Sequence, residues 1–178
     1  MTNHEEVLDD LIYYARAGEL EELKNVENVT PEMFAEKNDT GKTALHMASA
    51  NNHVDIVSYI LEQFAKLDKE KKIDLVNVKN EQGNTPLHWA ALNGHYDVVE
   101  LLVNNGADCK IKNNMNISPI YEAQQRNHEK VAEFFLKTMV DEEEEEEPLG
   151  EDEQYVETGA PSTVTSSEKK DSEQVKKE

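Results

Sequence analysis

One recurring stretch limits the folds that this chain can adopt. Its best copy runs from Gly83 to Leu102, an imperfect copy begins at Gly41, and a divergent one begins at Ser118. By subtraction, Thr43 and Thr85 lie 42 residues apart, and Thr85 and Ser118 lie 33 apart. A period near 33 is typical of stacked repeats, in which each unit buries its apolar face against its neighbours. The chain is therefore predicted to form an array of repeats rather than a closed globule.

Each copy has the pattern of a turn followed by two short helices. Thr43, Thr85 and Ser118 can begin the first helix, because their side-chain oxygens accept a backbone N–H at a helix N-terminus. Small apolar residues follow on the first helix, and larger aliphatic residues follow on the second. The preceding turns are rich in Gly and Asn, which adopt positive φ most readily. We call these projecting turns the fingertips, and they are residues 38–41, 80–83 and 113–116.

A more degenerate copy precedes these three. Its apolar residues follow a helical rhythm that is interrupted at Gly18. Aligning Gly18 with Asn52, Gly94 and Asn127 makes this segment a first repeat, whose polar exterior suits the end of an array. The predicted repeat domain therefore spans 4–140, with repeats at about 4–37, 38–79, 80–112 and 113–140.

Nine extra residues separate the second and third repeats. The apolar spacing that begins at Ile56 continues through Ile60, Phe64 and Leu67, so we expect the second helix to be longer by about two turns. The inserted segment 64–73 also carries four lysines. They fit either a solvated helix end, where the helix dipole favours cations, or a docking site. The lysines are Lys66, Lys69, Lys71 and Lys72.

The chain is strongly acidic, with a net charge of −20. Residues 141–178 hold 15 Asp/Glu and 4 Lys, or −11, which leaves −9 on residues 1–140. This charge disfavours direct binding to nucleic acid and favours a basic protein partner. The polar segment 141–178 cannot bury enough apolar surface to order itself, so we predict a disordered acidic tail. Such a tail can act as a passive solubiliser or can screen a basic client, and both interpretations are open.

The sequence gives no sign of a disulfide-bonded protein, a membrane protein, a metal-binding protein or an enzyme. The lone Cys109 excludes an intrachain disulfide and is expected to be a small buried side chain in a reducing compartment. No apolar run is long enough for a membrane span. The repeated histidines lack the Cys or carboxylate that would complete a metal site, and no phosphate loop or nucleophile with its base is present. We therefore expect no cofactor, no metal and no enzymatic activity.

The motifs between Gly83 and Leu102 resemble the ankyrin repeat. They are Thr-Pro-Leu-His from Thr85, then Ala-Ala, Gly-His, Val-Val and Leu-Leu, and Gly-Ala-Asp closes the unit at Gly106. The resemblance implies an all-α solenoid of four helix–turn–helix repeats followed by the disordered tail. It also implies that His46 and His88 join neighbouring fingertips through hydrogen bonds. The departures from the family pattern are Asn52 and Asn127 in place of glycine, Ile120-Tyr121 in place of Leu-His, and the degenerate first copy.

The same resemblance implies a binding surface, because ankyrin proteins bind partners with their fingertips and the exposed face of their first helices. Trp89 is the strongest candidate anchor, since it combines a large apolar ring with a polar N–H. Its alternative role is packing between repeats. The predicted partner-binding residues are Asp39, Thr40, Lys42, Met47, Ala50, Asn51, Glu81, Gln82, Asn84, Trp89, Leu92, Asn93, Asn114, Met115, Glu122 and Gln125.

A narrower resemblance is to ankyrin-repeat chaperones of one small-subunit ribosomal protein. Four repeats, a lengthened second repeat, the block Gly83–Ala90 and an acidic tail carry it. It implies a monomeric, cytoplasmic and nuclear chaperone that captures ribosomal protein number three. This client is a KH-domain protein with a basic N-terminal region, and the chaperone would escort it to ribosome assembly. The alternative is a general ankyrin adaptor or inhibitor of a signalling protein.

Overall fold

The structure is a computed structural model that describes the backbone of residues 4–145 and the side chains of residues 4–140. All regular elements in this part are helical, which confirms the predicted all-α class. They are α1 (His4–Ala17), α2 (Leu20–Asn25), the 3-10 helix η1 (Pro31–Ala35), α3 (Ala44–Ala50), α4 (Val54–Phe64), α5 (Lys69–Val76), α6 (Pro86–Asn93), α7 (Tyr96–Asn104), α8 (Pro119–Gln125) and α9 (Glu129–Glu145).

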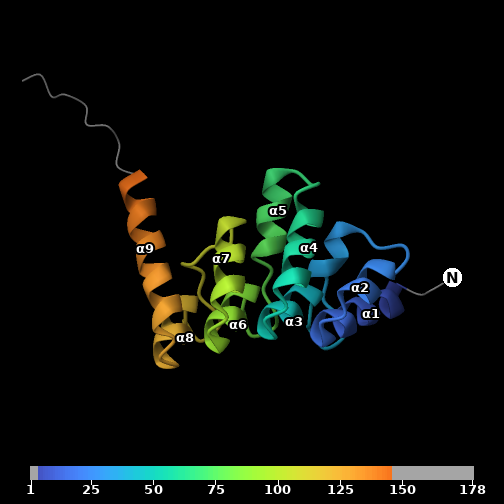
Figure 1. The fold of residues 1–178 in the computed structure, drawn as a ribbon, viewed down its shortest axis with the longest axis horizontal. Coiled ribbons are helices and arrows are strands. Elements are labelled where there is room, and N and C mark those ends of the chain that lie inside the picture. Colours follow the sequence, from blue (N-terminus) through green and yellow to red (C-terminus); the bar gives the residue numbers. More distant parts are fainter. Residues whose placement is uncertain (1–3, 146–178) are drawn as a thin grey trace, which may run out of the picture. The chain divides into compact units, whose positions relative to one another are not determined.

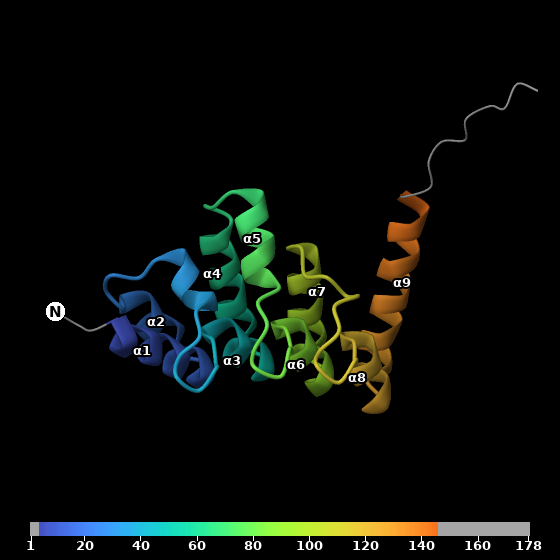
Figure 2. The same cartoon turned by 180° about the vertical axis from the view of Figure 1, so that it is seen from behind.

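The helices of residues 4–145 form two layers of a repeat array. The first helices α1, α3, α6 and α8 pack in sequence order, each against the next, along the lower edge of Figures 1 and 2. The second helices α4, α7 and α9 pack side by side above them. In the first repeat, η1 occupies the corresponding position next to α4. This arrangement is the predicted solenoid of four helix–turn–helix repeats.

The division between small and large apolar residues explains the two layers. Ala48, Ala90 and Ala123 on the first helices are completely buried, so these helices approach one another closely. On the second helices, side chains such as Phe64 and Leu102 are also completely buried and fill the space between the layers. Burial of these large side chains is the main apolar stabilisation of each repeat.

The turns between paired helices confirm the alignment of the repeats. Gly94 has a φ of 73°, and the aligned Asn52 and Asn127 have φ values of 61° and 58°. Asparagine tolerates this left-handed conformation better than other residues with a Cβ. The departures from glycine at these two positions therefore leave the turn intact.

The predicted extension of the second helix is wrong. Helix α4 ends at Phe64, and a separate helix, α5, begins at Lys69. Asp68 fixes the start of the new helix, because its carboxylate accepts a hydrogen bond from the backbone N–H of Lys71 at 2.9 Å. The partly buried Leu67 continues the apolar spacing through the turn, although that turn is not helical.

The helix-end interpretation of the lysines is also wrong for three of them. Lys69, Lys71 and Lys72 lie in the first turn of α5, where the helix dipole disfavours cations. Lys71 forms an ion pair with Glu32 of η1, and this contact raises the pKa of Lys71 and lowers that of Glu32. Lys72 donates a hydrogen bond to Oδ1 of Asn105 at 3.0 Å. Two of the lysines therefore join α5 to elements on both sides.

The last helix runs past the predicted domain end. Helix α9 continues for five residues beyond Val140, to Glu145, because glutamate is a strong helix former. The remainder of the predicted tail, residues 146–178, lies outside the described residues. Cys109 is buried, as expected. Within residues 4–145, no helix has the length and apolar character needed to cross a membrane.

Candidate functional site

A ridge of large side chains crosses the first helices. Tyr13, Met47, Trp89 and Glu122 occupy the same position in their repeats, five residues before the turn residue aligned with Gly94. Their helices are neighbours in the array, so the four positions form a row. We call this row the inner ridge. Its first three members are two aromatic residues and a methionine, which are types enriched in protein interfaces relative to the rest of the surface.

Accessibility differs along the inner ridge and the fingertips. Tyr13 is 61% exposed, and Met115 on the last fingertip is 70% exposed. Trp89 is only partly exposed, and its indole nitrogen is shielded from solvent without a hydrogen-bond acceptor. Trp89 therefore has features of both an interface anchor and a packing residue between repeats. Part of its ring is accessible to a partner, whereas its N–H is enclosed by the protein. An unpaired buried donor carries a desolvation cost of about 1–3 kcal/mol.

The structure leaves every predicted partner-binding residue accessible. Ten are exposed, namely Asp39, Thr40, Lys42, Asn51, Glu81, Gln82, Asn93, Asn114, Met115 and Gln125. Six are partly exposed, namely Met47, Ala50, Asn84, Trp89, Leu92 and Glu122. Their role in binding a partner stays a prediction.

Several of these residues also hold the repeats together. The Asn93 amide donates to the backbone carbonyl of Ala50 in the preceding repeat at 3.2 Å. Asn84 accepts a 2.7 Å hydrogen bond from the Asn113 amide, and the Asn114 amide donates to the Glu81 carbonyl at 2.9 Å. These side chains therefore join adjacent repeats and fix the spacing of the fingertips.

Buried histidines provide the second set of links between fingertips. Nε2 of His46 donates to the carbonyl of Asn84 at 2.8 Å, and Nε2 of His88 lies 3.0 Å from the carbonyl of Ile117. Because a carbonyl can only accept, both rings carry their proton on Nε2. Nδ1 of His46 then accepts from the Thr43 hydroxyl at 2.8 Å. The role that the family resemblance implied for these two histidines is confirmed.

The surroundings of these histidines favour the neutral ring. Burial lowers the pKa of His46 to about 4, although its hydrogen bond to Asn84 acts in the opposite direction. Burial also lowers the pKa of His88. Among the described side chains of residues 4–140, no group of three or more His, Cys, Asp or Glu is placed to hold a metal ion.

Tyr13 is the ridge residue that was missing from the predicted surface. The alignment of Gly18 with Gly94 places Tyr13 at the position of Trp89, so the signal was available in the sequence. The first repeat differs so much from the others that only this alignment shows the equivalence of Tyr13 and Trp89.

The fold, the fingertip turns and the histidine links define a protein of the ankyrin-repeat class. Residues 3–113 match the family model described as ankyrin repeats in three copies. The chain belongs to the ankyrin-repeat family.

Two relatives and one solved structure are similar to this chain over most of its length. An ankyrin repeat-containing protein of Schizosaccharomyces pombe is 46% identical over 129 residues, which are 72% of this chain and 84% of that protein. The ankyrin repeat-containing protein YAR1 of Saccharomyces cerevisiae is 41% identical over 145 residues, which are 78% of this chain and 72% of that protein.

The solved structure is the crystal structure of the yeast ribosomal protein Rps3 in complex with its chaperone Yar1. One of its chains matches with a TM-score of 0.71 and 40% identity, over 78% of this chain and 95% of that chain.

Proposed function

We propose that this protein is a dedicated chaperone of the cognate Rps3, meaning the Rps3 of the same organism. It captures the newly made ribosomal protein, keeps it soluble and escorts it to assembly of the small ribosomal subunit. The observation that carries this proposal is the match at 40% identity to a chain of the yeast complex between Rps3 and its chaperone Yar1.

The surface of the protein suits such a client. Tyr13, Met47 and Trp89 offer apolar contacts along the inner ridge, and the chain as a whole carries a charge of −20. Apolar anchors on a protein of negative net charge complement a basic amphipathic segment. The opposite charges accelerate encounter, and the ridge confers specificity.

Binding, rather than catalysis, is the activity that we propose. The curated relatives are ankyrin repeat-containing proteins, and the solved match comes from a complex of a chaperone with its client. Capture requires only a complementary surface, and the protein then acts as a stoichiometric monomer without a cofactor. A general adaptor would bind signalling proteins in place of Rps3, and the binding experiment below separates the two functions.

Replacing Trp89 by alanine is expected to weaken binding of the cognate Rps3 by about 30-fold, which corresponds to about 2 kcal/mol. The reason is the loss of the largest side chain on the inner ridge. Isothermal titration calorimetry with the full chain and purified cognate Rps3 measures the change. Tyr121→Ala is the control, because Tyr121 is 47% exposed on α8 but lies outside the ridge. Equal affinities for wild type and Trp89→Ala would eliminate the ridge as the main contact, and no binding by wild type would overturn the proposed function.

We also propose that the protein works in both cytoplasm and nucleus. Its client is made in the first compartment and assembled into ribosomal particles in the second. Fluorescence microscopy of a tagged full-length chain tests this, and exclusion of the chain from either compartment would contradict it.

A further inference from the structure

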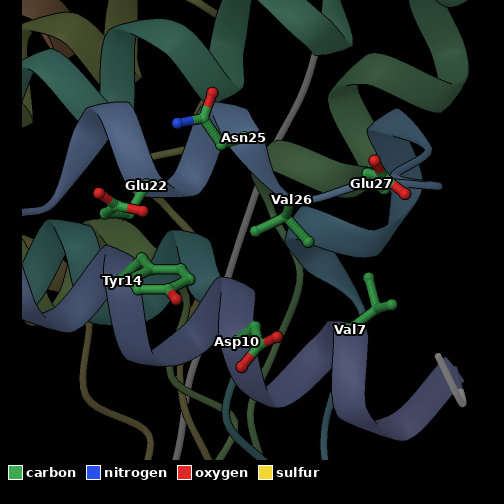
Figure 3. A pocket seen from close by; sticks show the side chains of 7 residues that line it. All are labelled: Val7, Asp10, Tyr14, Glu22, Asn25, Val26 and Glu27. Atoms are coloured by element: carbon green, nitrogen blue, oxygen red, sulfur yellow. The ribbon is translucent and has the colours of Figure 1, made fainter.

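The first repeat contains a groove between α1 and the end of α2. Val7, Tyr14 and Val26 form its apolar part, and Asp10, Glu22 and Glu27 supply carboxylates at its rim. Figure 3 shows Asp10 and Tyr14 on α1 bordering the same opening as Glu22 and Val26. The groove has a volume of about 300 Å³. We call it the N-terminal groove.

The repeat pattern explains why this groove is open. Asp10 and Tyr14 align with Pro86 and Ala90 of the third repeat, and both of those residues are buried. The aligned residues of the last repeat are buried as well, although no repeat follows it among the described residues. In the last repeat, the elements that pack on α8 are α6 of the preceding repeat and α9 of the same repeat. The first repeat has none before it in residues 4–145, so the corresponding surface is left uncovered.

The N-terminal groove lies in the most acidic part of the array. Residues 4–27 hold eight Asp/Glu and two Lys/Arg, a net charge of −6. Within residues 4–140, Asp10, Glu22 and Glu27 make no ion pair, whereas Lys24 pairs with Glu21 at 3.0 Å. The pKa of Tyr14 is raised by burial first and then by the negative charges of Asp10 and Glu22. The rim carboxylates are therefore available to an incoming cation.

We propose that the N-terminal groove receives a lysine or arginine side chain from a basic segment of the client. The aliphatic part of that side chain lies on Val7, Tyr14 and Val26, and its charged end lies between Asp10 and Glu22. Long basic side chains combine these two properties, because their methylene groups are apolar and their charge is terminal. The groove is a second contact, separate from the inner ridge, and the identity of the client rests on the proposed function.

Net charge disfavours the other candidate occupants of the groove, namely the tail and a second copy of the protein. The tail of this chain holds 15 Asp/Glu and 4 Lys over residues 141–178, so its net charge of −11 disfavours binding at a rim with the same sign. A second copy of the protein would bring another first repeat with a charge of −6. Like charges placed together without counter-ions destabilise a complex. A basic partner is attracted to the rim by its net charge.

The test combines a double substitution with a matched control. Asp10→Asn together with Glu22→Gln is expected to weaken binding of the cognate Rps3 by about fivefold at low salt, because two partly exposed ion contacts are lost. Glu62→Gln together with Glu133→Gln changes the total charge equally at exposed positions outside the groove, and should leave affinity within about twofold. Equal effects of the two double variants would overturn the inference.

A second measurement does not depend on Rps3. A 12-residue peptide that alternates arginine and alanine is titrated into the isotope-labelled full chain, and backbone amide signals are followed by NMR. Shifts at Tyr14, Glu22 and Val26 that disappear in the Asp10→Asn, Glu22→Gln variant would support the groove. Unmoved signals at these residues would contradict it. Failure of wild type to bind Rps3 together with peptide binding in the groove would overturn the proposed function alone.

Discussion

The variant Leu102→Ala is expected to lose about 3 kcal/mol of unfolding free energy. Leu102 lies on α7 in the third repeat, and its side chain is completely buried. Truncation to alanine removes apolar contacts and leaves a cavity that the packed neighbours close only in part. Urea denaturation followed by circular dichroism measures the loss.

Leu136→Ala provides the matched control for this prediction. It makes the same chemical change on α9, but Leu136 is 51% exposed. Its expected cost is below about 0.5 kcal/mol, the usual range for surface substitutions. Similar losses for both variants would contradict the assignment of α7 to the core between the two layers.

Acidification is expected to destabilise the array through His46. The folded protein holds the His46 pKa at about 4, below the ordinary value of 6.5. The unfolded chain therefore binds a proton at a higher pH than the folded chain does. The stability due to the neutral ring is complete above pH 6.5 and is lost as the pH falls towards 4, by about 3 kcal/mol in total. Protonation also removes the acceptor of the Thr43 hydroxyl, which is buried.

The variant His46→Gln isolates this effect, because carboxylates that titrate in the same range are common to both proteins. Wild type is expected to be the more stable at pH 7, and the difference should shrink by about 3 kcal/mol at pH 4. Urea denaturation across this range measures both proteins. A difference in stability that does not vary with pH would show that His46 titrates alike in the folded and unfolded chains.

The repeat pattern predicted most of the fold because each repeat carries its own local signals. Asn52 could be aligned with Gly94 because asparagine, after glycine, is the residue that best tolerates positive φ, and the structure has positive φ at both positions. The insertion was mispredicted because apolar spacing was given more weight than capping. Leu67 continues the apolar rhythm of α4, but α4 ends at Phe64 and Asp68 caps a separate helix, α5.

The candidate site was predictable in its location but not in its details. Trp89 could be placed on the exposed face of its helix, but the enclosure of its indole nitrogen depends on packing that the pattern does not specify. Asn84 and Asn93 were expected to be left for a partner. Both bond to neighbouring repeats, because amide side chains are long enough to reach them. The N-terminal groove exists because Asp10 and Tyr14 have no preceding repeat to cover them among the described residues.

The most direct test of the chaperone function is a measurement of aggregation. Cognate Rps3 is diluted from denaturant into buffer at physiological salt, and light scattering is followed with and without the full chain. The proposed function predicts that one equivalent of wild-type chain suppresses the scattering, and that Trp89→Ala requires a clear excess. Undiminished scattering at several equivalents of correctly folded wild-type chain would contradict the proposed function.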